Sequence, residues 1–103
     1  MDSKSKREIA KATAQLMADL ESARSPKLLH DRYRWPYAIL RELRWRDSQR
    51  SIRAADLVVR CVQRDGLAEI NASYARELIS ALRAGGAPIE SARSAGYWWG
   101  GDL

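Results

Sequence analysis

Arginine is concentrated in the middle of this chain, and its planar guanidinium group is well suited to bidentate contacts with phosphates and base edges. Residues 24–64 contain ten Arg and one Lys against four carboxylates, a balance of +7 within a total net charge of +5. Residues 1–23 balance at 0 and residues 65–103 at −2. This basic band favours a polyanionic partner. The alternative is a solvated helical surface encoded by an Arg-rich genome.

Groups that could perform catalysis or bind a metal are sparse. His30 is the only histidine, and no metal ligand, nucleophile or orienting group accompanies it at a suitable spacing, so we expect a loop or surface role. Cys61 borders an apolar stripe and is expected to be buried, whereas in an exposed position Arg60 would lower its thiol pKa. The carboxylates are mostly flanked by Arg, which is typical of ion pairs. We therefore predict no enzyme activity, no metal and no cofactor.

Length and composition predict one modest domain, because 103 residues with 46% hydrophobic and 30% charged side chains can form a single core. A single cysteine excludes an internal disulfide and favours a reducing compartment. The apolar runs at 57–59 and 97–99 are far too short to cross a bilayer, and the polar N-terminus does not resemble a signal peptide. We expect a soluble, cytoplasmic protein of bacterial or phage type without a membrane partner.

Residues 5–23 have the pattern of an amphipathic helix. Ser5 and Glu8 have the spacing of a capping box at its start. Its apolar stripe either docks on the rest of the domain or pairs with a second copy in a homodimer. We predict that residues 1–24 form this helix and that residues 25–103 form the domain that follows it. The stripe consists of Ile9, Leu16, Met17 and Leu20.

Three further helices are expected within the domain. The first begins at Pro36, a residue suited to the first helical position, and extends to about residue 46. The second has Ser51 as its N-cap and ends at Asp65-Gly66. The third has Asn71 as its N-cap and ends at Gly85-Gly86. The predicted buried stripes are Ile52, Ala55, Val58, Val59 and Val62 in the second helix, and Ala75, Leu78, Ile79 and Leu82 in the third.

The C-terminal residues predict a β-hairpin. Residues 87–89 are the first strand, residues 90–96 the connection and residues 97–99 the return strand. Because side chains alternate across a strand, Tyr97 and Trp99 are expected to pack beneath the hairpin, leaving Trp98 exposed.

Three aromatic side chains upstream have two interpretations. Trp35, Tyr37 and Trp45 could stack on bases, as aromatics do in proteins that bind single strands. Their helical spacing beside the apolar residues of the first domain helix instead favours the core. We therefore expect them to be buried.

A polar cap, a helix and a hairpin follow one another in residues 70–99. The helix ends in Leu82-Arg83 and is followed by Gly85-Gly86, by Pro88-Ile89, by a polar turn and by a Gly-Tyr-Trp strand at 96–98. This combination resembles the recognition helix and wing of bacterial winged helix-turn-helix regulators. With the Arg-Glu-Leu-Ile segment at 76–79, it is most similar to small regulatory or replication-associated proteins of phages. The resemblance implies a mainly α fold with a C-terminal β-hairpin, a winged-helix domain preceded by an N-terminal helix.

The resemblance also implies roles for individual residues. The start of the helix would read base edges in the major groove, and these residues are Asn71, Ser73, Tyr74 and Arg76. Phosphate contacts would come from Arg41, Arg44, Arg46, Arg50, Arg53, Arg60 and Arg83. The wing would contribute Ser91, Arg93, Ser94 and Trp98.

The expected function is therefore sequence-preferring binding of double-stranded DNA by a small transcriptional or replication regulator. An alternative is a phage-encoded protein-interaction module or inhibitor that docks on a host nucleic-acid complex. The negative balance of residues 65–103 and Trp98 motivate this alternative. Binding of RNA or of single strands is a third hypothesis.

Overall fold

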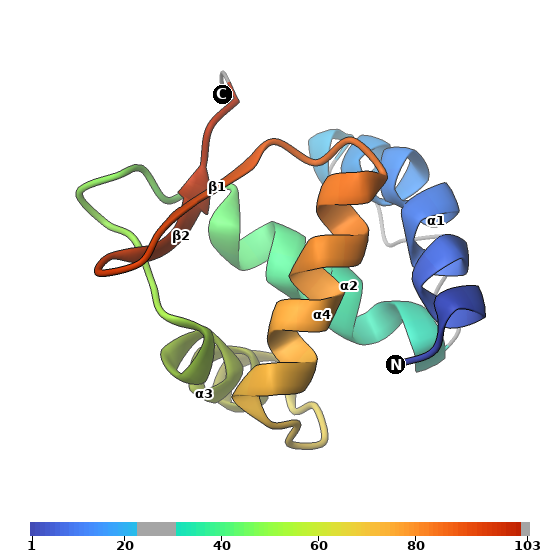
Figure 1. Cartoon of the computed structure of the whole chain (residues 1–103), viewed down its shortest axis with the longest axis horizontal. Helices are drawn as coiled ribbons and strands as arrows, with labels where there is room; N and C mark the ends of the chain where they lie inside the picture. The colour runs from blue at the N-terminus through green and yellow to red at the C-terminus, as the bar shows by residue number, and fades with distance from the viewer. Residues whose placement is uncertain (23–30, 102–103) are drawn as a thin grey trace.

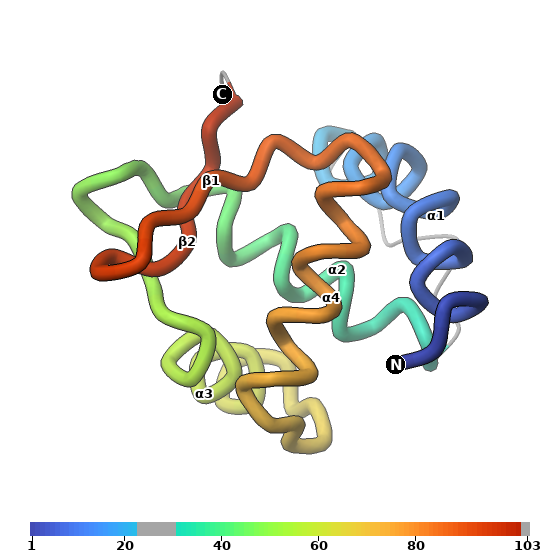
Figure 2. Tube along the Cα trace, in the orientation of Figure 1, coloured from blue at the N-terminus to red at the C-terminus, as the bar shows by residue number. Residues whose placement is uncertain are grey.

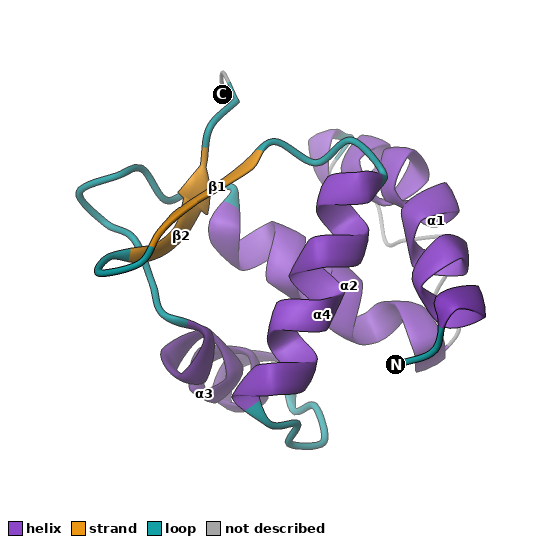
Figure 3. Cartoon of the chain, in the orientation of Figure 1, coloured by secondary structure: helices purple, strands orange, loops and turns teal. Residues whose placement is uncertain are grey.

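The computed structural model describes residues 1–22 and 31–101. These residues form helices followed by a two-stranded antiparallel hairpin, which confirms the expected mainly α fold with a C-terminal β-hairpin (Figure 1 and Figure 3). His30 and the predicted domain boundary near residue 25 lie outside the described residues. The elements are α1 (Ser3–Glu21), α2 (Asp31–Leu43), α3 (Ala54–Asp65), α4 (Ala72–Ala84), β1 (Ile89–Ala92) and β2 (Gly96–Trp99).

Helix α4 lies at the centre of the molecule and contacts α1, α2 and α3 (Figure 1). Its N-cap is Asn71, as predicted, and the Asn71 side chain accepts a hydrogen bond from the backbone N–H of Tyr74. Gly86 follows the helix with a φ of 104°, a conformation that glycine adopts without strain. The predicted stripe of Ala75, Leu78, Ile79 and Leu82 is buried in the core.

Helix α1 docks on α4 along its apolar stripe. Ile9 and Leu16 belong to the same buried cluster as the leucines of α2 and α4. The chain itself therefore covers this stripe, and the stripe does not require a second copy. The predicted Ser5 cap is wrong, because Asp2 caps the helix by accepting a hydrogen bond from the Ser5 N–H at 2.7 Å. Glu8 instead pairs with Arg32 of α2 at 2.7 Å.

Helix α2 begins earlier than predicted. It starts at Asp31, so Pro36 lies inside the helix and not at its first position. A proline lacks the N–H that would bond to the carbonyl of Arg32 four residues before it. The Pro36 ring is fully buried, and its hydrophobic contribution helps to offset this lost hydrogen bond.

Helix α3 also begins elsewhere, because the chain before it belongs to the hairpin. Ile52 forms a β-bridge with Tyr97, with backbone N–H···O distances of 2.9 and 2.7 Å between the two residues. The helix consequently starts at Ala54 and not after a Ser51 cap. The buried face of α3 also differs from the predicted stripe, since Leu57, which the stripe did not include, is buried and Val59, which it did include, is half exposed. The predicted end at Gly66 is confirmed, with a φ of 65°.

The hairpin pairs β1 with β2 from Ile89↔Trp99 to Ala92↔Gly96. The first strand therefore starts two residues later than predicted and includes residues assigned to the connection. Ala87 lies outside it because its N–H bonds back to the Leu82 carbonyl at the end of α4. On the other side, the N–H of Trp99 donates to the Arg46 carbonyl at 3.0 Å. The segment between α2 and α3 thus runs alongside the hairpin (Figure 2).

The aromatic side chains divide between the core and the surface. Trp35 and Tyr37 pack against the core as predicted, as do Tyr97 and Trp99. Trp45 does not, because α2 ends at Leu43 and the helical spacing stops before this residue. Trp98 is half-buried and not fully exposed as predicted.

Candidate nucleic-acid interface

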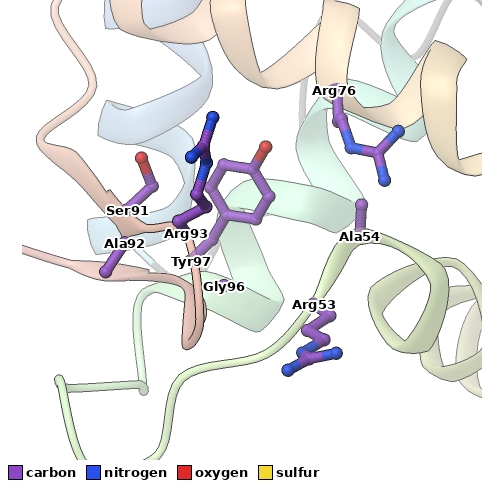
Figure 4. A pocket seen from close by; sticks show the side chains of 8 residues that line it. All are labelled: Arg53, Ala54, Arg76, Ser91, Ala92, Arg93, Gly96 and Tyr97. Carbon is purple, nitrogen blue, oxygen red and sulfur yellow. The ribbon is translucent and has the colours of Figure 1, made fainter.

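A groove of about 360 Å³ lies between α4, the start of α3 and the hairpin turn (Figure 4). Arg76 reaches it from α4, Arg93 from the turn between β1 and β2, and Arg53 from the residue that precedes α3. Ala54, Ser91, Ala92, Gly96 and Tyr97 complete its lining. Three arginines that are far apart in the sequence thus line one concave surface.

Backbone contacts position the groove. The Arg53 guanidinium donates to the Ser94 carbonyl at 3.1 Å, which links the start of α3 to the hairpin turn. Gly96 allows the hairpin to lie close to the backbone of Ile52, because a Cβ on residue 96 would be only 2.3 Å from the Ile52 carbonyl oxygen. Arg76 lies on the exposed face of α4. The β-bridge at Ile52 therefore determines where Arg53 meets the hairpin.

The groove is electropositive. Among the described residues, no carboxylate forms an ion pair with Arg53, Arg76 or Arg93. The N-terminus of α3 also faces the groove through Ala54, and the Arg53 side chain makes no hydrogen bond that caps this helix. Free amides at a helix start carry partial positive charge. The surface is suited to an anion with several oxygens, such as a phosphate.

A polar stripe continues from the groove along α4. Ser73, Arg76, Ser80 and Arg83 are exposed at the spacing of one helical face. Arg83 donates from Nε to the Ile89 carbonyl at 2.7 Å, and its guanidinium carbon lies 5.7 Å from the centre of the Tyr97 ring. Arg83 therefore joins the end of α4 to the hairpin, and the stripe and the hairpin form one surface.

The residues predicted to read bases do not all lie on this surface. Asn71 uses its side-chain oxygen to cap α4. Ser73 and Arg76 lie on the polar stripe. Tyr74 lies on nearly the opposite side of α4 from Arg76, because each residue turns the helix by about 100° and two residues turn it by about 200°. It lies against α1, beside Lys4 and Arg32.

The arginines predicted to bind phosphate differ in their partners. Arg41 pairs with Asp65, and Arg46 and Arg60 face the buried carboxylate of Glu42 at 3.0 and 3.5 Å. Each of these three side chains faces a carboxylate of the protein itself, although the Arg60 side chain remains 60% exposed. Arg44 lies over the Trp45 ring, Arg50 pairs with the exposed Asp47, and Arg53 alone of this set lines the groove.

The hairpin residues predicted to form the wing have distinct places. Ser91 and Arg93 line the groove, and Ser94 accepts the hydrogen bond from Arg53 through its carbonyl. Trp98 pairs with Glu90 across the hairpin. Tyr97 was predicted as a packing residue, and its contribution to the groove was missed. The hairpin alternation signals its burial, but only the bridge to Ile52 places it beside Arg53.

Cys61 is buried as predicted, and desolvation raises its thiol pKa to about 11, which outweighs the opposing influence of the nearby arginines. Within residues 1–22 and 31–101, no three metal-ligating side chains gather. Over the same part of the chain, every helix is too short or too polar to span a bilayer.

Comparison with known proteins adds no relative. No family model, no curated protein and no solved structure matches this chain. The interpretation of the groove therefore depends on the residues that line it.

Proposed function

We propose that this protein binds duplex DNA with a preference among sequences, as a small cytoplasmic regulator of transcription or replication. The observation that carries the proposal is the convergence of Arg53, Arg76 and Arg93 on one groove without a carboxylate partner among the described residues. Cationic side chains from separate elements at one concave surface are suited to successive phosphates.

The order of elements supports the same proposal. Helices α3 and α4 are consecutive and in contact, and the hairpin follows α4 directly. This agrees with the winged helix-turn-helix arrangement, in which the second of the two helices enters the major groove and the hairpin lies on the adjacent backbone. In that orientation Ser73 and Arg76 face base edges, while Arg53 and Arg93 flank them at phosphates.

Single substitutions in the groove test the proposal. Arg53→Ala, Arg76→Ala and Arg93→Ala are each expected to weaken binding of a labelled duplex by about tenfold, since a hydrogen bond to a charged group contributes roughly 1.5–3 kcal/mol. Fluorescence anisotropy measures these affinities. Arg7→Ala is the matched control, because Arg7 is an exposed arginine on α1, a helix that contributes no residue to the groove. An equal loss in the control would show that binding follows total charge and would contradict the proposed site.

A further inference from the structure

Trp45 is the most exposed large hydrophobic side chain among the described residues, with 64% of its surface accessible. It lies in residues 44–51, the first part of the segment that connects α2 to α3, here called the Trp45 loop. An indole in water forgoes the free energy that burial would provide. A partner that covers the Trp45 ring would gain this free energy of burial.

The Trp45 loop is held in place by hydrogen bonds. The Arg46 carbonyl accepts from the Trp99 N–H at 3.0 Å, and the Arg46 guanidinium donates to the Arg50 carbonyl at 2.8 Å. The Asp47 carboxylate accepts from the Arg50 N–H at 3.0 Å. On the other side of Trp45, the Arg44 N–H donates to the Leu40 carbonyl at 3.0 Å, so the backbone on both sides of the exposed ring is held.

The Trp45 ring has a cation on one face. The guanidinium carbon of Arg44 lies 5.7 Å from the ring centre, a cation–π geometry. This contact orders the ring and leaves surface for a second planar group. An exposed, pre-ordered indole beside a guanidinium is suited to stack on a nucleobase, because every base offers a π-face and carries a phosphate nearby.

The surroundings of the loop favour a nucleic acid over an apolar partner. Of the four arginines in residues 44–53, Arg46 pairs with Glu42 and Arg50 with Asp47, whereas Arg44 and Arg53 form no ion pair with a carboxylate among the described residues. The loop leads directly to Arg53 in the groove and is bonded to the same strand, β2, that contributes Tyr97 (Figure 2). A DNA strand that runs from the groove toward Trp45 would therefore meet Arg53 at one end and Arg44 at the other.

We propose that Trp45 stacks on an unpaired base adjoining the duplex held in the groove, so that the preferred ligand is DNA with a junction between double and single strand. Bases inside a duplex are already stacked on both faces, whereas an unpaired base has a face that is free to stack on the indole. This inference rests on the proposed function, and it adds a second contact site to it.

The test uses three DNA ligands: a blunt duplex, the same duplex with a short single-stranded tail, and the tail strand alone. The wild-type protein is expected to bind the tailed duplex about fivefold or more tightly than the blunt one, the lower end of base–aromatic stacking. Trp45→Ala is expected to remove this preference without changing the blunt-duplex affinity. Trp45→Phe, which keeps a π-face, is expected to retain most of it.

The outcomes separate the two proposals. Equal affinity for blunt and tailed duplexes, or an equal loss on both in Trp45→Ala, would overturn the stacking site and leave duplex binding standing. Trp45-dependent binding of the tailed duplex or the tail strand, with no binding of the blunt one, would support the stacking site and overturn the proposed function. Binding of none of the three ligands would overturn both.

Discussion

The availability of each arginine is decided by the carboxylates nearest to it in space. Arg64 and Arg46 reach the Glu42 carboxylate at 2.8 and 3.0 Å, and Glu42 is only 7% exposed. Arg76 and Arg93 project into an open groove instead. Glu42 and Arg46 are four residues apart in the sequence, but the contact of Glu42 with Arg64 requires α2 and α3 to be packed together. Counting arginines along the chain therefore overstated the number that face a ligand.

The Glu42 carboxylate should be important for stability. Glu42→Gln leaves Arg46, Arg60 and Arg64 without their shared counter-charge at a buried position, so the free energy of unfolding should fall by about 2 kcal/mol. Denaturant unfolding measures this loss. The control is Asp31→Asn, which removes a pair that is almost fully exposed on the carboxylate side and should change little. Equal effects of the two substitutions would contradict a structural role for Glu42.

The Cys61 thiol should link stability to pH in the alkaline range. Its pKa is raised by burial from 9.0 to about 11, so the unfolded chain loses this proton at a lower pH than the folded one. This contribution to stability is complete below pH 9 and is lost as the pH rises from about 9 toward 11. The decrease in unfolding free energy over that range should be smaller in Cys61→Ala. An unchanged pH profile in the variant, or rapid alkylation of the native thiol at neutral pH, would contradict this account.

Elements whose start and stop residues lie within their own segment could be predicted from the sequence. Elements whose bounds depend on pairing with residues far along the chain could not. Helix α4 has its cap at Asn71 and its stop at Gly86 within its own segment, and both predictions are confirmed. Helix α3 was misplaced because Ile52, which is suited to a helical stripe, pairs with Tyr97 from the other end of the domain. That same pairing builds the groove, so the feature that misled the helix prediction also brings Arg53 to Arg93.

The packing of α1 on α4 depends on the absence of a side chain at Gly85. A Cβ there would lie 2.3 Å from the Ala10 carbonyl oxygen and 2.4 Å from the Thr13 hydroxyl oxygen. Gly85→Ala should therefore force the two helices apart and destabilise the fold by about 2 kcal/mol, as overpacking does. The backbone at Gly85 has an ordinary negative φ, so the effect is steric.

Gly86→Ala is the informative control for that substitution. Gly86 has a φ of 104°, but a Cβ added there would meet open space within 4 Å, so alanine introduces backbone strain without a clash. Limited proteolysis should release α1 from the Gly85→Ala protein and leave it attached in Gly86→Ala. Equal protection of α1 in both variants would show that the close approach at Gly85 is not needed for docking.

The site is a property of the whole molecule, since its cations come from the start of α3, the middle of α4 and the hairpin turn. The sequence favoured a basic surface in residues 24–64, but two of the three groove arginines lie in the segment with a negative balance. Helix packing and the bridge at Ile52 convert this dispersed charge into one concave surface. The bridge between Ile52 and Tyr97 and the packing of the helices therefore determine the proposed site, whereas the amino-acid composition alone does not.

Duplex binding across a salt series tests the role of this groove most directly. A labelled mixed-sequence duplex is titrated by fluorescence anisotropy, and the logarithm of the association constant is plotted against the logarithm of salt concentration. Three groove arginines that each neutralise a phosphate predict a slope of about −2.7 or steeper, at about −0.9 per phosphate. Arg76→Ala should make the slope shallower by about one phosphate, whereas Arg7→Ala should leave it unchanged. A flat salt dependence, or no binding at low salt, would contradict the claim that this protein holds DNA through the groove.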